Sequence, residues 1–156
     1  MRSYDLDYIR QAIIIASRAR QHGNHPFGAL LVDADGHPLL EAENTVVTEN
    51  DVTGHAETNL IRKASAQFPR ELLEGCSLYT STEPCAMCAG AIFWSGVGRV
   101  VYALSERSLL KLVAHLPGGE FLDLPCQEVF AHGGRSVEVL GPYLEGEASL
   151  VHAGFW

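Results

Sequence analysis

Apolar and polar residues follow a helical spacing at the start of the chain and a strand-like pattern soon after it. Between Leu6 and Ala16 apolar residues recur every three to four positions and arginines fall elsewhere, which predicts a helix over residues 5–21. The apolar run at 28–32, followed by the turn signal Asp35-Gly36, predicts a strand that opens a hairpin. The remaining expected elements are strands at 37–43, 76–79, 99–102 and 136–140, and helices at 55–67, 84–95 and 105–116.

This succession of strands and helices predicts an α/β domain whose sheet is covered on both faces. A length of 156 residues suits one domain with a sizeable core, so residues 1–156 are taken as a single domain. Thr53 and Pro84 are expected at the starts of two helices, and the helix from Pro84 is apolar enough to be buried. The roughly 33-residue connection to the last strand allows a crossover, but periodicity leaves open whether the last two strands run parallel.

Composition and charge narrow the range of partners. With 47% hydrophobic and 19% charged residues the chain is globular, and no apolar run approaches the roughly 20 residues of a membrane span. Because no signal peptide is recognisable either, we expect a cytoplasmic protein without membrane contacts. The net charge is −8, and three basic residues stand against seven acidic ones beyond residue 100. This balance favours a small neutral base or nucleoside over nucleic acid, unless cations cluster in space.

Two short stretches hold the residues that carry chemistry, His55-Ala56-Glu57 and Pro84-Cys85-Ala86-Met87-Cys88. Imidazole nitrogen and thiolate sulfur are common zinc ligands, and His55, Cys85 and Cys88 supply three of them. A catalytic zinc keeps its fourth position for water, so the sequence predicts one Zn²⁺ per chain with a bound water and Glu57 as the base beside it. Two alternatives to this site are open. Cys85 and Cys88 would then pack in the core as small apolar side chains, and Glu57 would only complement the partial positive charge of a helix N-terminus.

The order of these stretches, HAE followed 26 residues later by PCAMC, resembles the H-x-E…P-C-x-x-C signature of zinc deaminases. Four further short motifs resemble sequences of one branch of the cytidine deaminase-like superfamily, which includes bacterial guanine deaminases, nucleoside deaminases and tRNA adenosine deaminases. These motifs are HPFGA at 25–29, NTV at 44–46, YTSTE at 79–83 and GAIFW at 90–94. The likeness runs from about Leu6 to Tyr102 and fades afterwards.

The resemblance implies the cytidine deaminase-like fold, a three-layer α/β/α sandwich with a five-stranded mixed sheet. It also implies hydrolytic deamination of a nucleobase or nucleoside, with guanine to xanthine and ammonia as the first candidate and cytosine- or cytidine-type substrates as an extension. Two alternatives stay open. A tRNA-specific adenosine deaminase is disfavoured by the acidic second half, and a catalytically silent zinc scaffold is disfavoured by the presence of Glu57.

The same resemblance implies several substrate contacts. Asn44 would offer an amide donor and acceptor to the ring, and Ala56 would offer its backbone. Phe27 and Trp94 would form aromatic walls, with packing in the core as the alternative. The base would be a small molecule enclosed between these groups.

A second acidic residue is also implied, roughly sixty positions after the glutamate of HAE. Glu120 lies 63 positions after Glu57 and would hold the N–H edge of a purine. Glu106 and Asp123 are alternatives for this role, and a solvated loop charge is the alternative for Glu120 itself.

The C-terminal segment 142–156 is expected to act as a lid. It ends in Phe155 and Trp156, and chain ends are usually loose and polar unless they are docked. Guanine deaminases of this branch are dimers whose C-terminal segment crosses to the neighbour's pocket. The resemblance therefore implies a homodimer with an exchanged segment and a contact between Trp156 and the substrate, while packing on the chain's own core is the alternative.

Overall fold

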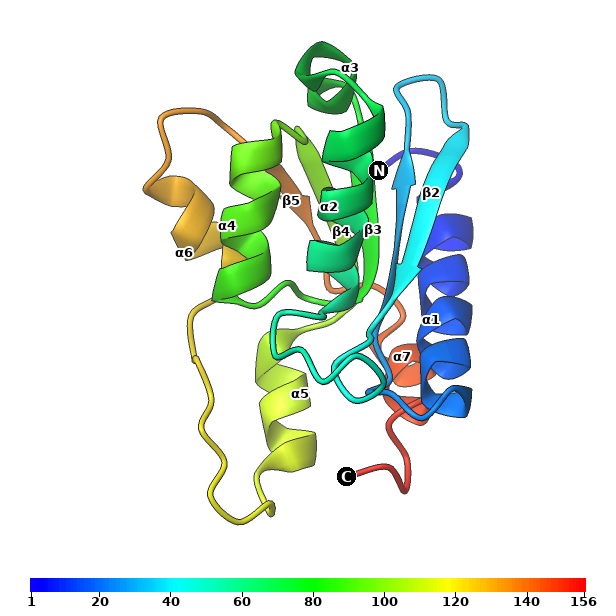
Figure 1. Ribbon diagram of the computed structural model, residues 1–156, viewed down its shortest axis with the longest axis vertical. Helices are drawn as coiled ribbons and strands as arrows, with labels where there is room; N and C mark the ends of the chain where they lie inside the picture. Colours follow the sequence, from blue (N-terminus) through cyan, green and yellow to red (C-terminus); the bar gives the residue numbers. More distant parts are fainter.

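The computed structural model describes residues 1–156 and is built around one five-stranded sheet (Figure 1). The strand order is β2–β1–β3–β4–β5. β1 pairs antiparallel with β2 and with β3, whereas β3, β4 and β5 run parallel, so the sheet is mixed as expected. The strands are β1 (Gly28–Val32), β2 (Pro38–Glu43), β3 (Ser77–Thr82), β4 (Arg99–Leu104) and β5 (Glu138–Leu140).

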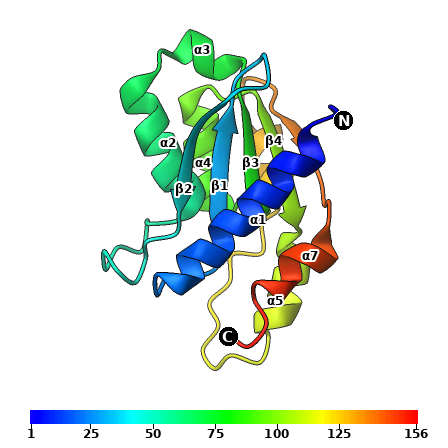
Figure 2. The same cartoon turned by 90° about the vertical axis from the view of Figure 1, so that its right-hand side faces the viewer.

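Helices cover both faces of this sheet, which confirms the three-layer α/β/α architecture. α1 crosses one face with α7 beside it, and α2 and α4 pack together on the other face (Figures 1 and 2). None of the helices has both the length and the apolar character needed to cross a membrane. The helices are α1 (Asp5–Gln21), α2 (Ala56–Gln67), α3 (Arg70–Glu74), α4 (Ala86–Ser95), α5 (Glu106–Val113), α6 (Cys126–Ala131) and α7 (Glu145–Leu150).

Two apolar clusters hold the layers together. One cluster of 16 buried residues lies between the sheet and α2, α4 and α6, and another of 11 lies between the sheet and α1. Every residue of β1, β3 and β4 is buried, because helices cover both faces of these central strands. The central strands are therefore rigid supports for the residues at their ends.

The structure departs from the sequence-based elements in several places. α3, α6 and α7 were not predicted, because helices of five or six residues carry too little periodicity to be recognised. β3 runs on through Thr80 to Thr82, which are polar but buried. Thr53 does not cap α2, since its hydroxyl bonds to Asp51, and Pro84 lies outside α4, which begins at Ala86.

Candidate active site

The N-termini of α2 and α4 bring the two sequence motifs together. His55 is the N-cap residue of α2 and Cys85 is the N-cap residue of α4, and both have extended backbone conformations. Neither side chain makes a capping hydrogen bond, so both are free to turn toward a common centre. Cys88 follows one turn into α4, on the same side as Cys85. Because α2 and α4 pack against each other, the three side chains converge.

The spacing of these three side chains fits a tetrahedral zinc ion. The His55 Nδ1 atom lies 3.5 Å from the Sγ atom of Cys85 and 3.5 Å from that of Cys88. Zn–S bonds of about 2.3 Å and Zn–N bonds of about 2.0–2.1 Å at a tetrahedral angle place sulfur and nitrogen about 3.5 Å apart. The three ligand atoms all lie within 4.8 Å of one another. The donor set therefore fits zinc with a fourth position open.

The thiols of Cys85 and Cys88 shift each other's pKa in opposite directions. A hydrogen bond from Cys88, followed by one from His55, lowers the pKa of the Cys85 thiol to about 4. The same contact with Cys85, together with burial, raises the pKa of Cys88. Thr58 lies close by, with its hydroxyl oxygen 3.3 Å from the Cys88 sulfur. A lowered pKa favours the thiolate form of Cys85, which is the form that binds a metal.

Glu57 lies beside these ligands in the first turn of α2 and is only 5% exposed. The hydroxyl of Thr80 donates a 2.7 Å hydrogen bond to its Oε1 atom. Burial raises the pKa of Glu57, and the Thr80 contact opposes that effect. A carboxyl group with a raised pKa, anchored by one hydrogen bond, is suited to accepting and returning a proton.

Glu57, His55 and Cys85 open onto a cavity of about 90 Å³. This volume is well below the roughly 300–1,000 Å³ of pockets for drug-sized ligands. The cavity is lined by Phe27, His55, Glu57, Thr82, Glu83, Cys85, Glu106 and Leu109. The site is therefore small, enclosed and rich in carboxyl groups.

Asn44, Ala56 and Phe27 lie around this site. Phe27 lines the cavity, and its carbonyl oxygen accepts a hydrogen bond from the N–H of Asn44. The Asn44 side chain is 1% exposed, and its oxygen accepts from the N–H of Val46 while its amide nitrogen donates to no other group of the chain. Ala56 is fully buried next to His55. A donor on Asn44 is thus available, and the substrate contacts of all three stay predictions.

Trp94 and Glu120 lie elsewhere. Trp94 is 77% exposed near the C-terminal end of α4, about two and a half turns from Cys85, so it is not a wall of this cavity in the single chain. Its exposure also corrects the expectation that α4 is buried all round. Glu120 is exposed in the segment between α5 and α6, and Glu106 occupies the cavity instead. Glu106 is the first residue of α5, and Ser105, the N-cap residue of that helix, joins it to the end of β4. This junction between a strand and a helix is a sequence signal that could have identified Glu106 as a residue of the site.

The C-terminal segment packs near the site of its own chain. The Trp156 ring lies 6.2 Å from that of Phe27 and 5.4 Å from that of His25, and its indole N–H donates to His152 Nδ1 at 3.0 Å. The Arg20 guanidinium on α1 donates to the carbonyl oxygens of Val151 and Ala153 and lies over the Phe155 ring. In this single chain the C-terminal segment docks on the chain's own surface, which is the alternative to an exchange of segments between subunits.

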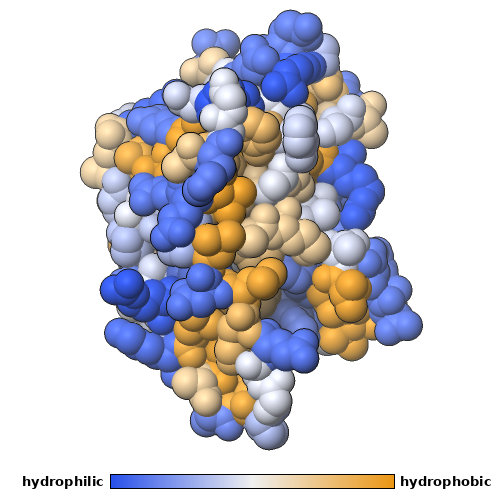
Figure 3. All heavy atoms as spheres, turned by 90° about the vertical axis from the view of Figure 1, so that its left-hand side faces the viewer, coloured by the Kyte–Doolittle hydropathy of each residue, from blue (hydrophilic) through white to orange (hydrophobic).

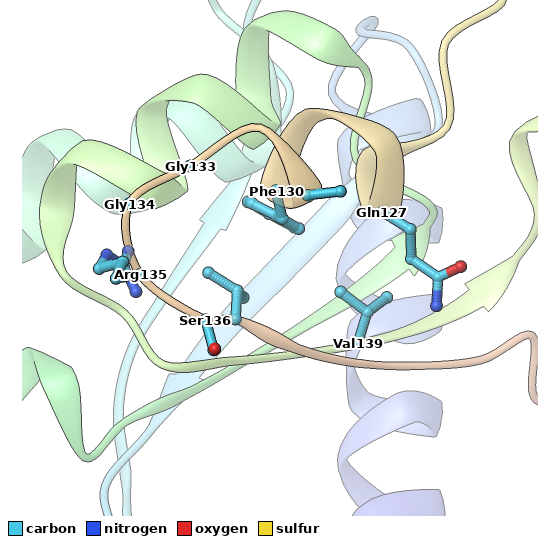
Figure 4. Close-up of a pocket in the computed structure, with 9 residues that line it drawn as sticks. Gln127, Phe130, Gly133, Gly134, Arg135, Ser136 and Val139 are labelled. Atoms are coloured by element: carbon cyan, nitrogen blue, oxygen red, sulfur yellow. The ribbon is translucent and has the colours of Figure 1, made fainter.

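A larger hollow of about 430 Å³ lies away from these residues, between α6 and β5 (Figure 4). Arg135 is its only charged lining residue. The guanidinium of Arg135 already donates to the carbonyl oxygens of Ile92, Phe93 and Val97 at the end of α4. The one charged group of this hollow is therefore used in holding the end of α4.

Comparison with known proteins agrees with this geometry. Residues 2–104 match the family described as the cytidine and deoxycytidylate deaminase zinc-binding region. The chain belongs to this deaminase family. A probable cytosine deaminase from Schizosaccharomyces pombe is 43% identical over 152 residues, which are 97% of this chain and 92% of the relative. A tRNA-specific adenosine deaminase from Bacillus subtilis is 40% identical over 149 residues, 96% of this chain and 86% of the relative.

A solved structure of a member of this deaminase family is also similar. The X-ray structure of guanine deaminase from Bacillus subtilis matches with a TM-score of 0.61 and 37% identity, over 71% of this chain and 69% of that one. Membership in the family confirms a zinc-dependent hydrolytic deaminase. His55, Cys85 and Cys88 are the cluster in this chain that fits the zinc.

Proposed function

We propose that this deaminase removes the amino group of a free nucleobase, with guanine, giving xanthine and ammonia, as the first candidate from the sequence. The observation that carries the proposal is one small cavity onto which two of the three zinc ligands and the buried Glu57 all open. A flat aromatic base suits such a space, because Phe27 offers a ring face and the carboxyl groups offer polar contacts.

Glu57 is the residue that moves protons in this proposal. Zinc, when bound, supplies a water molecule whose pKa is lowered toward neutrality. Glu57 accepts a proton from the water and passes it to the ring nitrogen beside the amine-bearing carbon. As the water oxygen bonds to that carbon, its second proton passes by way of Glu57 to the amine, which departs as ammonia when the C–N bond breaks. One carboxyl group thus acts in turn as base and acid. The hydrogen bond from Thr80 holds Glu57 in the orientation that both transfers need.

Cytosine is a second candidate, supported by two observations. The probable cytosine deaminase aligns with 97% of the chain at 43% identity, whereas the guanine deaminase structure from Bacillus subtilis matches 71% of it at 37% identity. A cavity of about 90 Å³ also suits one ring better than two. Guanine and cytosine share the same reaction, so the roles of His55, Cys85, Cys88 and Glu57 are unchanged between them.

The tRNA-specific adenosine deaminase is the competing function, supported by the relative from Bacillus subtilis. The net charge of −8 opposes it, since RNA affinity at physiological salt depends on cationic contacts. The docked aromatic residues at the C-terminus oppose it as well, because they leave little room for a stem-loop beside Phe27.

A homodimer and a cytoplasmic location belong to the same proposal. Apolar side chains are exposed in the segment before α6, on the side of the molecule seen in Figure 3, where orange patches lie among hydrophilic residues. Those of this segment are Phe121, Leu122 and Leu124, and the Trp94 side chain is exposed near the end of α4. We expect such a surface to be covered by a second copy, whether or not the C-terminal segments exchange. Light scattering on the purified protein tests the dimer.

Ammonia release tests the function itself. The zinc-loaded protein is assayed with guanine, cytosine, cytidine, guanosine and adenine, with Glu57→Gln as the control. Turnover of guanine or cytosine is the expected result. Binding to tRNA is measured beside it at two salt concentrations. Submicromolar tRNA binding at physiological salt, without turnover of any base, would replace the proposal with the tRNA function. Zinc binding without turnover of either kind would leave only a scaffold.

A further inference from the structure

Asn59 on α2 is a polar side chain buried among the segments that carry the site residues. It is 6% exposed and belongs to neither of the two motifs that hold the zinc ligands. Asn favours helix caps and turns over helix interiors, and a buried amide needs hydrogen-bond partners. A buried Asn inside a helix is therefore expected to hold something specific, and its partners show what that is.

The Asn59 amide nitrogen reaches both ends of the segment that joins β2 to α2 (Figure 1). It lies 2.9 Å from the Glu43 carbonyl oxygen, 2.9 Å from the Thr45 hydroxyl oxygen and 3.3 Å from the Gly54 carbonyl oxygen. Two hydrogens serve these three acceptors, so one hydrogen is shared. The backbone N–H of Thr45 donates to the same Gly54 oxygen at 2.8 Å. Asn59 thus closes the segment where it leaves the sheet and where it enters the helix.

The zinc ligand His55 is held by Asn59 through the peptide groups on both of its sides. The Gly54 carbonyl belongs to the peptide that precedes His55, and the Asn59 side chain donates to it. The His55 carbonyl belongs to the peptide that follows, and it accepts the backbone N–H of Asn59 at 2.9 Å. The His55 side chain makes no capping hydrogen bond, so its placement follows from these backbone contacts.

The same amide holds the backbone around Asn44. Its two shorter contacts are with the residue before Asn44, through the Glu43 carbonyl, and with the residue after it, through the Thr45 hydroxyl. Asn44 is 1% exposed, and its backbone N–H donates to the carbonyl oxygen of Phe27, a residue that lines the cavity. One side chain therefore contacts the neighbours of a zinc ligand and the neighbours of a proposed substrate contact.

We propose that Asn59 is a positioning residue that fixes the zinc ligand His55 and the side chain of Asn44 relative to each other. It acts through the backbone of these two residues. The part that concerns Asn44 rests on the proposed function, whereas the part that concerns His55 rests on the zinc site alone. Replacement of a residue that supports a metal ligand typically lowers metal affinity or activity by about 10- to 100-fold.

Asn24 offers a matched control, because it binds the middle of the same segment. It is 2% exposed, its side-chain oxygen accepts the N–H groups of Val47 and Thr48, and its amide nitrogen donates to the Thr48 hydroxyl. Asn24→Ala removes a similar set of hydrogen bonds but leaves both ends of the segment held by Asn59. A role in the stability of the segment alone would make the two substitutions equivalent.

Zinc affinity and kinetics separate the two roles. Asn59→Ala and Asn24→Ala should both lower the melting temperature, because each loses buried hydrogen bonds. Only Asn59→Ala should bind zinc more weakly, by about 10- to 100-fold in competition with a chelator. At saturating zinc it should also raise KM and lower kcat for the best base. Arg62→Met removes only the hydrogen bond that the Asn59 oxygen accepts, so its zinc affinity and kinetics should match the wild type.

The outcomes that would overturn the proposal are distinct. Unchanged zinc affinity in Asn59→Ala would overturn it, and so would a loss of the same size in Asn24→Ala. An unchanged KM in zinc-loaded Asn59→Ala would overturn the link to Asn44. If Asn59→Ala does not fold, Asn59→Ser, which keeps one donor, is measured against the same criteria. If the wild type releases ammonia from no base, the proposed function is wrong, and the zinc affinities still test Asn59.

Discussion

At the scale of single residues, two carboxyl groups in one cavity are held in different ways. Glu57 is anchored by Thr80 beside the zinc ligands, whereas Glu106 has no partner within the chain. Burial raises the pKa of both. The hydrogen bond from Thr80 fixes the orientation of Glu57 beside the zinc ligands, which suits that carboxyl group to moving protons.

Replacement of Glu57 tests this role. Glu57→Gln keeps the shape and the hydrogen bond from Thr80 but cannot take up a proton. We expect a folded protein with normal zinc content and a turnover lowered by roughly 10²- to 10⁴-fold. Metal analysis and steady-state rates on the same preparation measure both quantities. A zinc-loaded Glu57→Gln protein with near-normal turnover would assign the proton transfers to another group.

At the scale of elements, the first residue of α1 ties that helix to the sheet. Asp5 is fully buried and accepts hydrogen bonds from Tyr79 at 2.6 Å and from the Arg99 guanidinium at 2.7 and 2.9 Å. Burial by itself would raise the pKa of Asp5, but the bonds from Arg99 and Tyr79 outweigh it and lower the pKa to about 2. The ionised form is therefore the one that the fold stabilises.

Asp5→Asn should lower the free energy of unfolding at pH 7 by about 1.5–3 kcal/mol, because the buried Arg99 guanidinium loses one of its two carboxylate partners and keeps only Glu138. Since the folded pKa lies below the unfolded value, the contribution of Asp5 is fully present above about pH 5 and is lost as pH falls toward 2. The gap between wild type and variant should thus narrow at low pH in urea unfolding. Asp7→Asn, with its side chain 75% exposed, is the control and should change little. A gap that persists at pH 2 would contradict this account.

The C-terminal segment is a second element whose docking can be tested. Deletion of Gly154–Trp156 removes the rings that pack on His25 and Phe27. We expect kcat/KM to fall by about tenfold or more while zinc stays bound, because the site loses a cover that excludes water. Arg10→Met, which removes only exposed ion pairs with Asp7 and with Glu147 on α7, serves as the control. A truncated protein with full activity would show that the segment is no lid, whatever the oligomeric state.

At the scale of the whole molecule, the zinc ligands come from two helices that are separate in sequence. His55 begins α2, and Cys85 and Cys88 begin α4. A metal bound across them links the two helices, and such binding is coupled to folding. The layer formed by α2 and α4 should therefore depend on the metal for part of its stability.

Chelation tests this dependence. We expect about one zinc per chain and a melting temperature lower by about 5–10 °C after its removal, the shift for a ligand present at about 100 times its dissociation constant. Cys85→Ser should abolish both the zinc and the shift, whereas Cys126→Ala, at a buried cysteine outside the cluster, should retain the zinc. Full activity of the metal-free protein would contradict the zinc mechanism.

Much of the molecule was determined locally and could be read from the sequence alone. The helix over residues 5–21 and the strand over 28–32 matched the structure residue for residue, because their periodicity and turn residues lie within each segment. The zinc ligands were recognisable for the same reason, since HAE and CAMC each occupy the first turn of one helix. Tertiary structure decided the rest. Which acid enters the cavity, Glu106 or Glu120, depends on how α5 meets the end of β4, and the parallel pairing of β4 and β5 depends on a crossover of more than thirty residues. The exposure of Trp94 and the packing of the C-terminus on Phe27 could not be predicted from the sequence. Both depend on how segments far apart in the chain meet, and no local pattern encodes such contacts.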